Sequence, residues 1–145
     1  MNVELKHNLN VLTANFSVMY MKLHHFHWFV KGPQFFSLHE KFESLYNEAT
    51  GYVDELAERL LTLEETPIST LKECLELSTI EEAKRVGTDK EMVQEVIDDF
   101  QAIDQLLHKT MELAQKDDDE VTNDLLVGIS NNIQKHIWML RAYIG

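Results

Sequence analysis

Apolar residues recur every three or four positions along four long stretches of the chain. In the first stretch the spacing alternates between four and three without a slip from Leu5 to Val30. This spacing places the apolar side chains on one face of a helix. Gly32-Pro33 ends that helix, because proline lacks the amide donor that a continuing helix needs. The same periodicity predicts further long helices over residues 38–63, 89–107 and 121–144.

Capping signals indicate where these helices begin. A serine or threonine followed three residues later by glutamate is a capping box, and Ser37-Leu38-His39-Glu40 and Thr88-Asp89-Lys90-Glu91 fit it. The acidic run at residues 117–120 predicts a turn and the start of the last helix, capped by Asp118 or Asp119.

Residues 66–88 form the longest connection between two predicted helices. They contain three overlapping start signals, Thr70 with Glu73, Ser78 with Glu81 and Thr79 with Glu82, but only short apolar runs. We expect one short helix in a crossover between helices that are not antiparallel neighbours. The predicted fold is all-α, a four-helix bundle with a short extra helix in the crossover between the second and third long helices.

Length and composition agree with one bundle. A chain of 145 residues forms one domain or two very small ones, and we find neither a repeat nor a linker, so we expect a single domain over residues 1–145. Five glycines and two prolines suit a few long elements rather than the many turns of an all-β fold. The one cysteine, Cys74, cannot form an internal disulfide, and we expect it reduced and half-buried.

The charge balance bears on partners and location. The formal net charge is −12, and an acidic protein repels the phosphate backbone of nucleic acid. No stretch is long and apolar enough for a transmembrane helix, and the start of the chain lacks a secretory signal pattern. We therefore expect a cytoplasmic protein with no membrane association.

Four residues of the second predicted helix are candidate metal ligands: His39, Glu43, Asp54 and Glu58. They form two i,i+4 pairs on the side facing away from the apolar stripe. At about 1.5 Å per residue, His39 and Glu58 are ~28 Å apart along the axis, and Glu43 and Asp54 ~16 Å. One chain cannot bring all four to one ion, and a solvated helix face is the simplest interpretation of the acids alone.

The two pairs are, however, symmetric about the point between residues 48 and 49. If two copies of this helix pack antiparallel across a two-fold axis, His39 meets the partner's Glu58 and Glu43 meets the partner's Asp54. The small residues Thr50, Gly51 and Ala57 on the same side permit close approach. The result is two equivalent sites per dimer.

His27, near the end of the first helix, can reach the first turn of the second. Two imidazoles with carboxylates and open positions suit redox-active iron(II), whereas structural zinc prefers a closed shell, although zinc can still bind there. Without the other four candidate ligands, His27 would be interpreted simply as a histidine of the core or of the helix end. Trp28 beside it is an interface residue or an oxidisable ring near the site. An iron site inside the bundle is disfavoured, since Glu-x-x-His occurs only at Glu4 to His7.

These residues and their surroundings closely resemble the Dps family, the mini-ferritins. The resemblance rests on the five spaced ligands and on the stretches at residues 27–33, 54–59, 121–124 and 135–140, and it covers essentially the whole chain. It implies a ferritin-like fold and a hollow dodecamer built from two-fold dimers. It also implies intersubunit ferroxidase centres that oxidise iron(II) to iron(III), preferentially with hydrogen peroxide or else with dioxygen, and store the ferric mineral inside.

The resemblance also gives roles to single residues. Glu43 stands where many members carry aspartate, which can move or loosen the second iron. Glu40 matches an acidic position linked to mineral nucleation, although the capping box alone also explains it. Acidic three-fold pores that admit iron correspond to Asp117, Glu120 and Asp124, for which capping and solvation are the alternative interpretation.

Protection of the cell and its DNA would then be chemical, by removal of iron(II) and peroxide together. Some relatives bind DNA through a lysine-rich N-terminal extension, whereas this chain begins almost directly with its first helix, so we expect no direct DNA binding. Two alternatives remain open: a structural or nucleoid-binding assembly without ferroxidase activity, and a di-iron oxidase acting on a small organic substrate.

Overall fold

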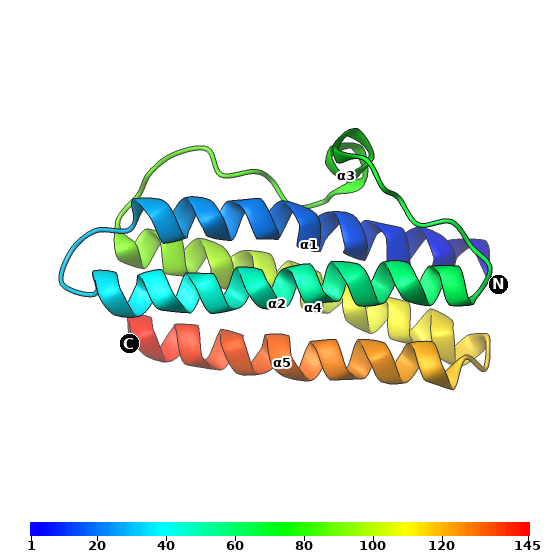
Figure 1. Cartoon of the computed structure of the whole chain (residues 1–145). Helices are drawn as coiled ribbons and strands as arrows, with labels where there is room; N and C mark the ends of the chain where they lie inside the picture. The colour runs from blue at the N-terminus through cyan, green and yellow to red at the C-terminus, as the bar shows by residue number, and fades with distance from the viewer.

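The computed structural model describes all 145 residues and consists of five helices without a strand (Figure 1). The all-α expectation, with a short extra helix in the crossover, is confirmed. None of the helices combines the length and apolarity that crossing a bilayer requires. The helices are α1 (Val3–Phe29), α2 (Phe35–Thr62), α3 (Leu71–Leu77), α4 (Asp89–Lys116) and α5 (Glu120–Ile144).

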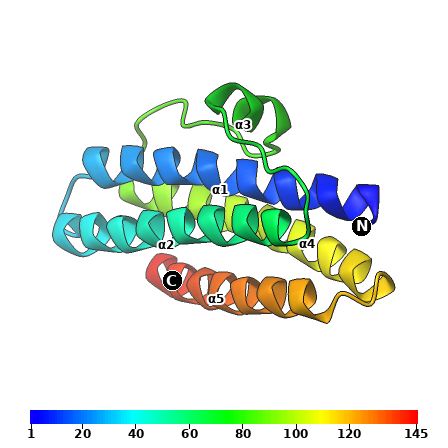
Figure 2. The ribbon, with the colours of Figure 1, turned by 45° about the vertical axis from the view of Figure 1, so that its right-hand side comes forward.

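The four long helices lie side by side as two antiparallel hairpins, α1 with α2 and α4 with α5 (Figures 1 and 2). α2 and α4 run in the same direction, so the chain must return along the whole bundle between them. The crossover does this on the outer side of α1, and the short α3 lies across α1 there. The predicted reason for the long connection is therefore confirmed.

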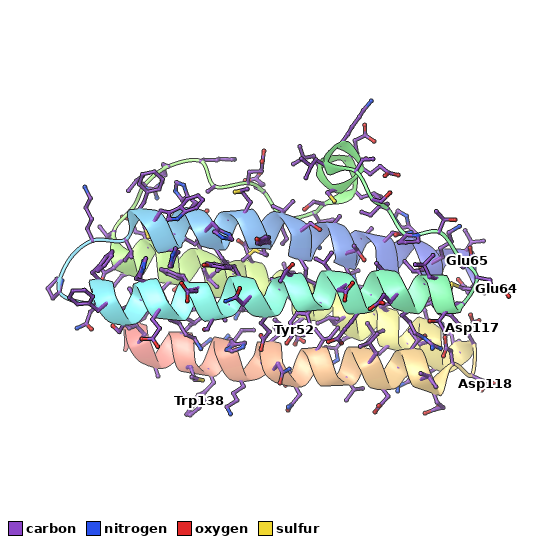
Figure 3. All side chains as sticks on the ribbon, in the orientation of Figure 1. Tyr52, Glu64, Glu65, Asp117, Asp118 and Trp138 are labelled. Carbon is purple, nitrogen blue, oxygen red and sulfur yellow. The ribbon has the colours of Figure 1, made fainter.

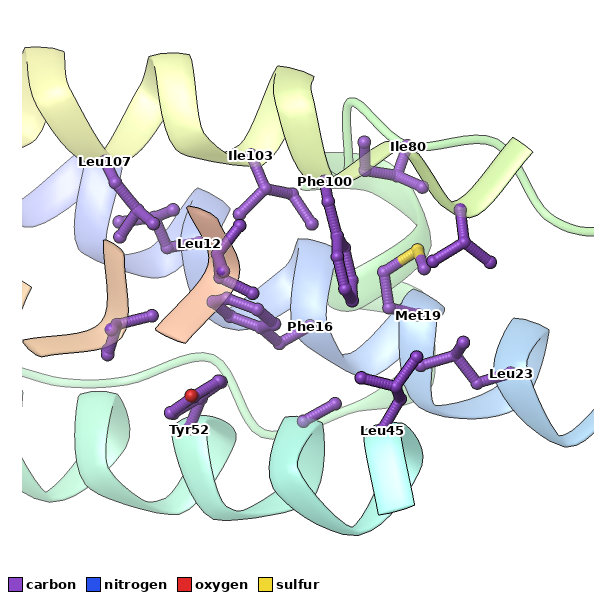
Figure 4. Packing of buried hydrophobic residues seen from close by; sticks show 14 of the residues in the cluster. Leu12, Phe16, Met19, Leu23, Leu45, Tyr52, Ile80, Phe100, Ile103 and Leu107 are labelled. Atoms are coloured by element: carbon purple, nitrogen blue, oxygen red, sulfur yellow. The ribbon is translucent and has the colours of Figure 1, made fainter. Parts of the chain in front are cut away.

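A continuous apolar cluster of 31 buried residues runs through the bundle. In α1 the predicted stripe is fully inside, with Leu5, Leu9 and Leu12 at 0% exposure and Phe16 at 1%. Figure 4 shows Phe16 between Tyr52 of α2 and the α4 side chains Phe100 and Ile103. α1 is also buried beyond its stripe, because the crossover covers its outer face.

Two buried asparagines of α1 hold the crossover in place. The side chain of Asn15 accepts a hydrogen bond from the amide of Thr79 at 2.8 Å and donates to the Thr79 hydroxyl at 3.0 Å. The side chain of Asn10 accepts from the amide of Ile68 at 2.9 Å. These bonds satisfy backbone donors of the connection, which has no regular ladder of its own.

A buried lysine fixes the crossover nearer its end. The Lys22 ammonium donates to the carbonyl of Glu81 at 2.9 Å and lies 2.7 Å from the Asp99 carboxylate of α4. Burial raises the pKa of Asp99, and the lysine opposes that change. This one side chain therefore connects α1, the crossover and α4.

The helix starts agree with the capping signals in all but one case. Thr70 and Thr88 form complete capping boxes with Glu73 and Glu91, and Asp119 caps α5 by accepting from the amide of Thr122. The expected box at Ser37 is wrong. α2 begins earlier, at Phe35, without a side-chain cap.

The tight turn before α2 explains this difference. Gly32 has a φ of +109°, a conformation that favours glycine, and its carbonyl accepts from the amide of Phe35 at 3.0 Å. The turn thereby starts the helix itself. Ser37 lies inside the first turn, and its hydroxyl donates to the carbonyl of Gln34.

The asparagine contacts predict local rather than global effects. Asn15→Ala removes the acceptor of the Thr79 amide, so hydrogen exchange at Thr79 should accelerate by about 5–150-fold, the range for a lost buried bond of ~1–3 kcal/mol. Asn10→Ala is the matched control and should accelerate hydrogen exchange at the Ile68 amide but not at the Thr79 amide. Equal acceleration of both amides in both variants would mean that the connection opens as one unit.

Candidate metal centre

His27 and His39 form a reciprocal pair at the closed end of the α1–α2 hairpin. Nδ1 of His27 donates to the backbone carbonyl of His39 at 2.7 Å, and Nδ1 of His39 donates to the carbonyl of His27 at 2.8 Å. The two rings stack, with centroids 3.7 Å apart and planes at 14°. Carbonyl oxygens only accept, so each Nδ1 must carry the proton.

In the neutral form of each ring, this tautomer leaves the lone pair of Nε2 available to bind a metal ion. His27 is buried at 6% exposure, and its Nε2 lies 3.9 Å from a carboxylate oxygen of Glu43. The hairpin therefore presents two neighbouring imidazole nitrogens beside a half-exposed carboxylate. A backbone contact on the far side of each ring fixes its orientation, as in many metal sites.

Aromatic rings surround this group, and two of them, His24 and Tyr46, were not predicted from the sequence. The ring of His24 stacks on Tyr46 at a centroid distance of 3.7 Å, and the Tyr46 hydroxyl is 3.5 Å from Glu43. Burial and the Glu43 carboxylate raise the pKa of Tyr46. Trp28 is 60% exposed and lies beside His24. The signal was present in the spacing, because His24 precedes His27 by one helical turn and Tyr46 follows Glu43 by one.

Asp54 and Glu58 lie on the same outer side of α2 but further along it, and both are exposed. The structure does not bring them to the histidines, as the axial distances require. Nowhere in the chain do three side chains of histidine, cysteine, aspartate or glutamate converge on a point where they could hold an ion. Within one chain the candidate ligands thus lie in two separate places.

The outer face of α2 has a shallow hollow between these two places. Thr50, Gly51, Asp54 and Ala57 are among its lining residues. An added Cβ at Gly51 would meet no atom of the chain within 4 Å. The small side chains therefore leave space at the middle of the helix, where a second helix can approach closely.

The opposite side of α2 is fixed to α5 by a polar network. Nε2 of His136 lies 2.7 Å from Glu48, and Asn132 donates to the Tyr52 hydroxyl at 3.0 Å. Burial raises the pKa of Tyr52. Burial alone would also raise the pKa of Glu48, but the hydrogen bond and charge of His136 outweigh it, and the pKa of Glu48 is lowered. These contacts set the rotation of α2 and so keep its ligand-bearing face outward.

The acidic residues of the α4–α5 turn have different surroundings. Asp117 accepts a hydrogen bond from the amide of Asn2 at 3.0 Å, while Glu120 and Asp124 are exposed at the start of α5. Figure 3 places Asp117 and Asp118 at the same end of the bundle as Glu64 and Glu65. Glu40 is exposed near the other end, in the second turn of α2.

Comparison with known proteins agrees with the fold. Residues 6–145 match the ferritin-like domain family, so the chain belongs to the ferritin-like proteins. It is 49% identical to DNA protection during starvation protein 2 of Bacillus anthracis, over 100% of this chain and 99% of the relative.

Two crystal structures of relatives superpose closely on it. Dps from Staphylococcus aureus has a TM-score of 0.97 and 46% identity, with 99% of this chain and 97% of that chain covered. Dps from Vibrio cholerae O1, described as a member of a broad superfamily of ferritin-like diiron-carboxylate proteins, has a TM-score of 0.94 and 34% identity, with 98% and 89% covered. Within the ferritin-like proteins, the chain is a member of the Dps family.

The reciprocal bonds predict a difference between two substitutions. His39→Asn keeps an N–H donor close to the position of Nδ1, whereas His39→Ala leaves the His27 carbonyl without its partner. The alanine variant should lose about 1–3 kcal/mol of stability and the asparagine variant at least ~1 kcal/mol less, in thermal unfolding with a chelator present. His7→Ala, an exposed histidine of α1, serves as the control. Equal losses for the two His39 variants would show that the Nδ1 bond contributes nothing.

Proposed function

We propose that this protein oxidises iron(II) to iron(III) at di-iron sites shared between two-fold related subunits, preferentially with hydrogen peroxide. The ferric mineral is stored inside a hollow dodecamer built from these dimers. The observation that carries the proposal is the reciprocal His27–His39 pair, whose free Nε2 atoms point to a metal at a place where one chain supplies too few ligands.

A second copy of the chain supplies the missing ligands. The outer face of α2 carries Asp54 and Glu58 at positions that mirror Glu43 and His39 about the middle of the helix. In an antiparallel α2–α2 contact across a two-fold axis, each histidine pair meets the partner's carboxylates. The hollow over Thr50 and Gly51 lies near that axis and supports a close contact. Each dimer then holds two sites.

Each site has the ligands for a pair of iron(II) ions as substrate. His27 and His39 bind through Nε2, and Asp54 and Glu58 of the other chain bind and bridge the ions. Glu43 lies where the two chains meet. Its side chain is one methylene longer than aspartate, which changes the position or the affinity of the second iron. Two iron(II) ions each give one electron, the O–O bond of peroxide breaks, and two protons complete two water molecules. Because the two electrons leave together, no hydroxyl radical is released. Zinc can occupy the same ligands.

Transport and storage involve the acidic surfaces. Asp117, Glu120 and Asp124 would form a ring of carboxylates around a three-fold pore and concentrate cations by their combined field. Glu40 would start mineral growth on the inner surface. The name of the Bacillus anthracis relative refers to DNA protection. In this chain we assign that protection to removal of iron(II) and peroxide in the cytoplasm, without direct DNA contact, since the net charge is −12.

The main alternative is an assembly in which the histidines and acids only hold subunits together. The Nε2 positions favour the ferroxidase, because packing alone does not require both rings to bond the backbone through Nδ1 and leave Nε2 available next to Glu43. An organic substrate is disfavoured at this site, since the ligands lie on the outer face of a helix rather than in an apolar pocket.

The carboxylates of α2 provide one test. The double variant Asp54→Asn, Glu58→Gln replaces two charged ligands with neutral side chains of nearly the same size. It should slow iron(II) oxidation by peroxide about 100-fold, measured by the absorbance of the ferric product. Glu55→Gln changes a neighbouring exposed acid outside the site and should keep the full rate. Light scattering checks that both remain assembled. Unchanged rates in the double variant would reject these ligands, and loss of assembly would support the structural alternative.

Sharing between subunits has its own signature. A His27→Gly, His39→Gly chain and an Asp54→Asn, Glu58→Gln chain should each be inactive alone. Co-expressed, they form mixed dimers in which one of the two sites is intact. With random pairing, about a quarter of the wild-type rate should return. A mixture that stays inactive, although mass spectrometry shows mixed particles, would exclude the shared site.

A further inference from the structure

A second group of polar side chains lies on the other hairpin, between α4 and α5. Asp104 and His108 are one helical turn apart on α4, and Ser130 and Gln134 are one turn apart on the facing side of α5. The Asp104 side chain is 17% exposed and that of His108 is 55% exposed. This α4–α5 cluster shares no residue with the proposed iron site, whose ligands are all on α1 and α2.

Three of its polar atoms form a nearly regular triangle. The Asp104 Oδ2 atom is 3.5 Å from His108 Nε2, and the Gln134 amide nitrogen is 3.1 Å from the first and 3.3 Å from the second. Ligands held at 2.0–2.1 Å around a tetrahedral ion are about 3.3 Å apart. The triangle therefore has the size of one face of a zinc coordination shell.

Ser130 positions the carboxylate. Its hydroxyl is buried and donates to Asp104 Oδ1 at 2.6 Å, which leaves Oδ2 turned toward His108 and Gln134. Such an outer hydrogen bond is a regular feature of metal-binding carboxylates. The Gln134 amide can rotate by half a turn, which places its oxygen where the nitrogen now lies. Asp104 and Gln134 also line an open surface hollow of about 520 Å³ together with Arg141, and the 55% exposed side chain of His108 is accessible from solvent.

We propose that Asp104, His108 and Gln134 form a divalent-metal site on the α4–α5 face, selective for zinc-like ions and separate from the iron-oxidising centre. Asp104 binds through Oδ2, His108 through Nε2 and Gln134 through its amide oxygen, and water takes the remaining position. One carboxylate, one imidazole and one amide make a mixed nitrogen and oxygen set that suits zinc better than magnesium or calcium. The ion connects α4 to α5.

The direct test is a crystal of the assembled protein soaked in zinc chloride, with anomalous scattering recorded at the zinc edge. A peak bounded by the three side chains is expected. In solution, His108→Ala should bind one zinc equivalent fewer per chain than the unaltered protein, while His7→Ala binds the same number. Because His108 is exposed, its removal should not prevent folding, and iron(II) oxidation should continue at its full rate.

A gain of affinity gives an independent readout. Gln134→Glu adds a charged ligand and should tighten zinc binding at this site at least tenfold in calorimetric titration. Gln94→Glu makes the same change on α4, two to three turns before Asp104, and should leave the zinc affinity of this site unchanged. Absence of the anomalous peak, or equal zinc stoichiometry in His108→Ala, would overturn the proposal. Neither result depends on whether the protein oxidises iron.

Discussion

The two hydrogen bonds between the rings and backbone carbonyls of His27 and His39 are the interaction on which the candidate iron chemistry depends. They connect the last turn of α1 to the beginning of α2, and they use Nδ1 of each ring. Nε2 of each ring is consequently left without a backbone partner, and Nε2 of His27 lies 3.9 Å from a Glu43 carboxylate oxygen. The bonds require the two helix ends to lie at one fixed separation, which the turn at Gly32 provides through its positive φ. Local backbone geometry thus selects the tautomer of the candidate ligands in their neutral form.

The parallel direction of α2 and α4 has consequences on the opposite side of the molecule. Because the chain must return along the bundle, the crossover covers α1 and buries Asn10, Asn15 and Lys22. Each of these polar side chains is satisfied by the crossover backbone that covers it. With α1 covered by the crossover and the inner side of α2 held against α5 through His136, the outer side of α2 remains open.

The sequence was sufficient for the features that depend on periodicity and spacing. The apolar stripe of α1 and the outward position of Asp54 and Glu58 follow from the helical repeat, and the crossover and its short helix follow from the length of the connection and its capping signals. The start of α2 could not be predicted in the same way, because the turn at Gly32 starts the helix before the capping box at Ser37 can, and the geometry of that turn is visible only in the folded chain. The tautomers of the histidines depend on backbone carbonyls across a hairpin, which side-chain patterns do not encode. The α4–α5 cluster pairs residues 26 apart in sequence, Asp104 and Ser130, and needs the register of two helices.

Under the proposed function, division of the ligands between subunits makes oxidation conditional on assembly. A single chain offers two imidazole nitrogens and one half-exposed carboxylate, and it places its remaining carboxylates ~16 Å or more away along α2. Such a chain holds iron(II) weakly and cannot bridge two ions. Paired oxidation then begins only once the dimer exists, and the mineral forms where the shell can retain it. The hollow at Gly51 lets two α2 helices approach closely. The symmetric placement of the four candidate ligands on α2 means that one antiparallel contact between these helices completes both sites of the dimer in one step.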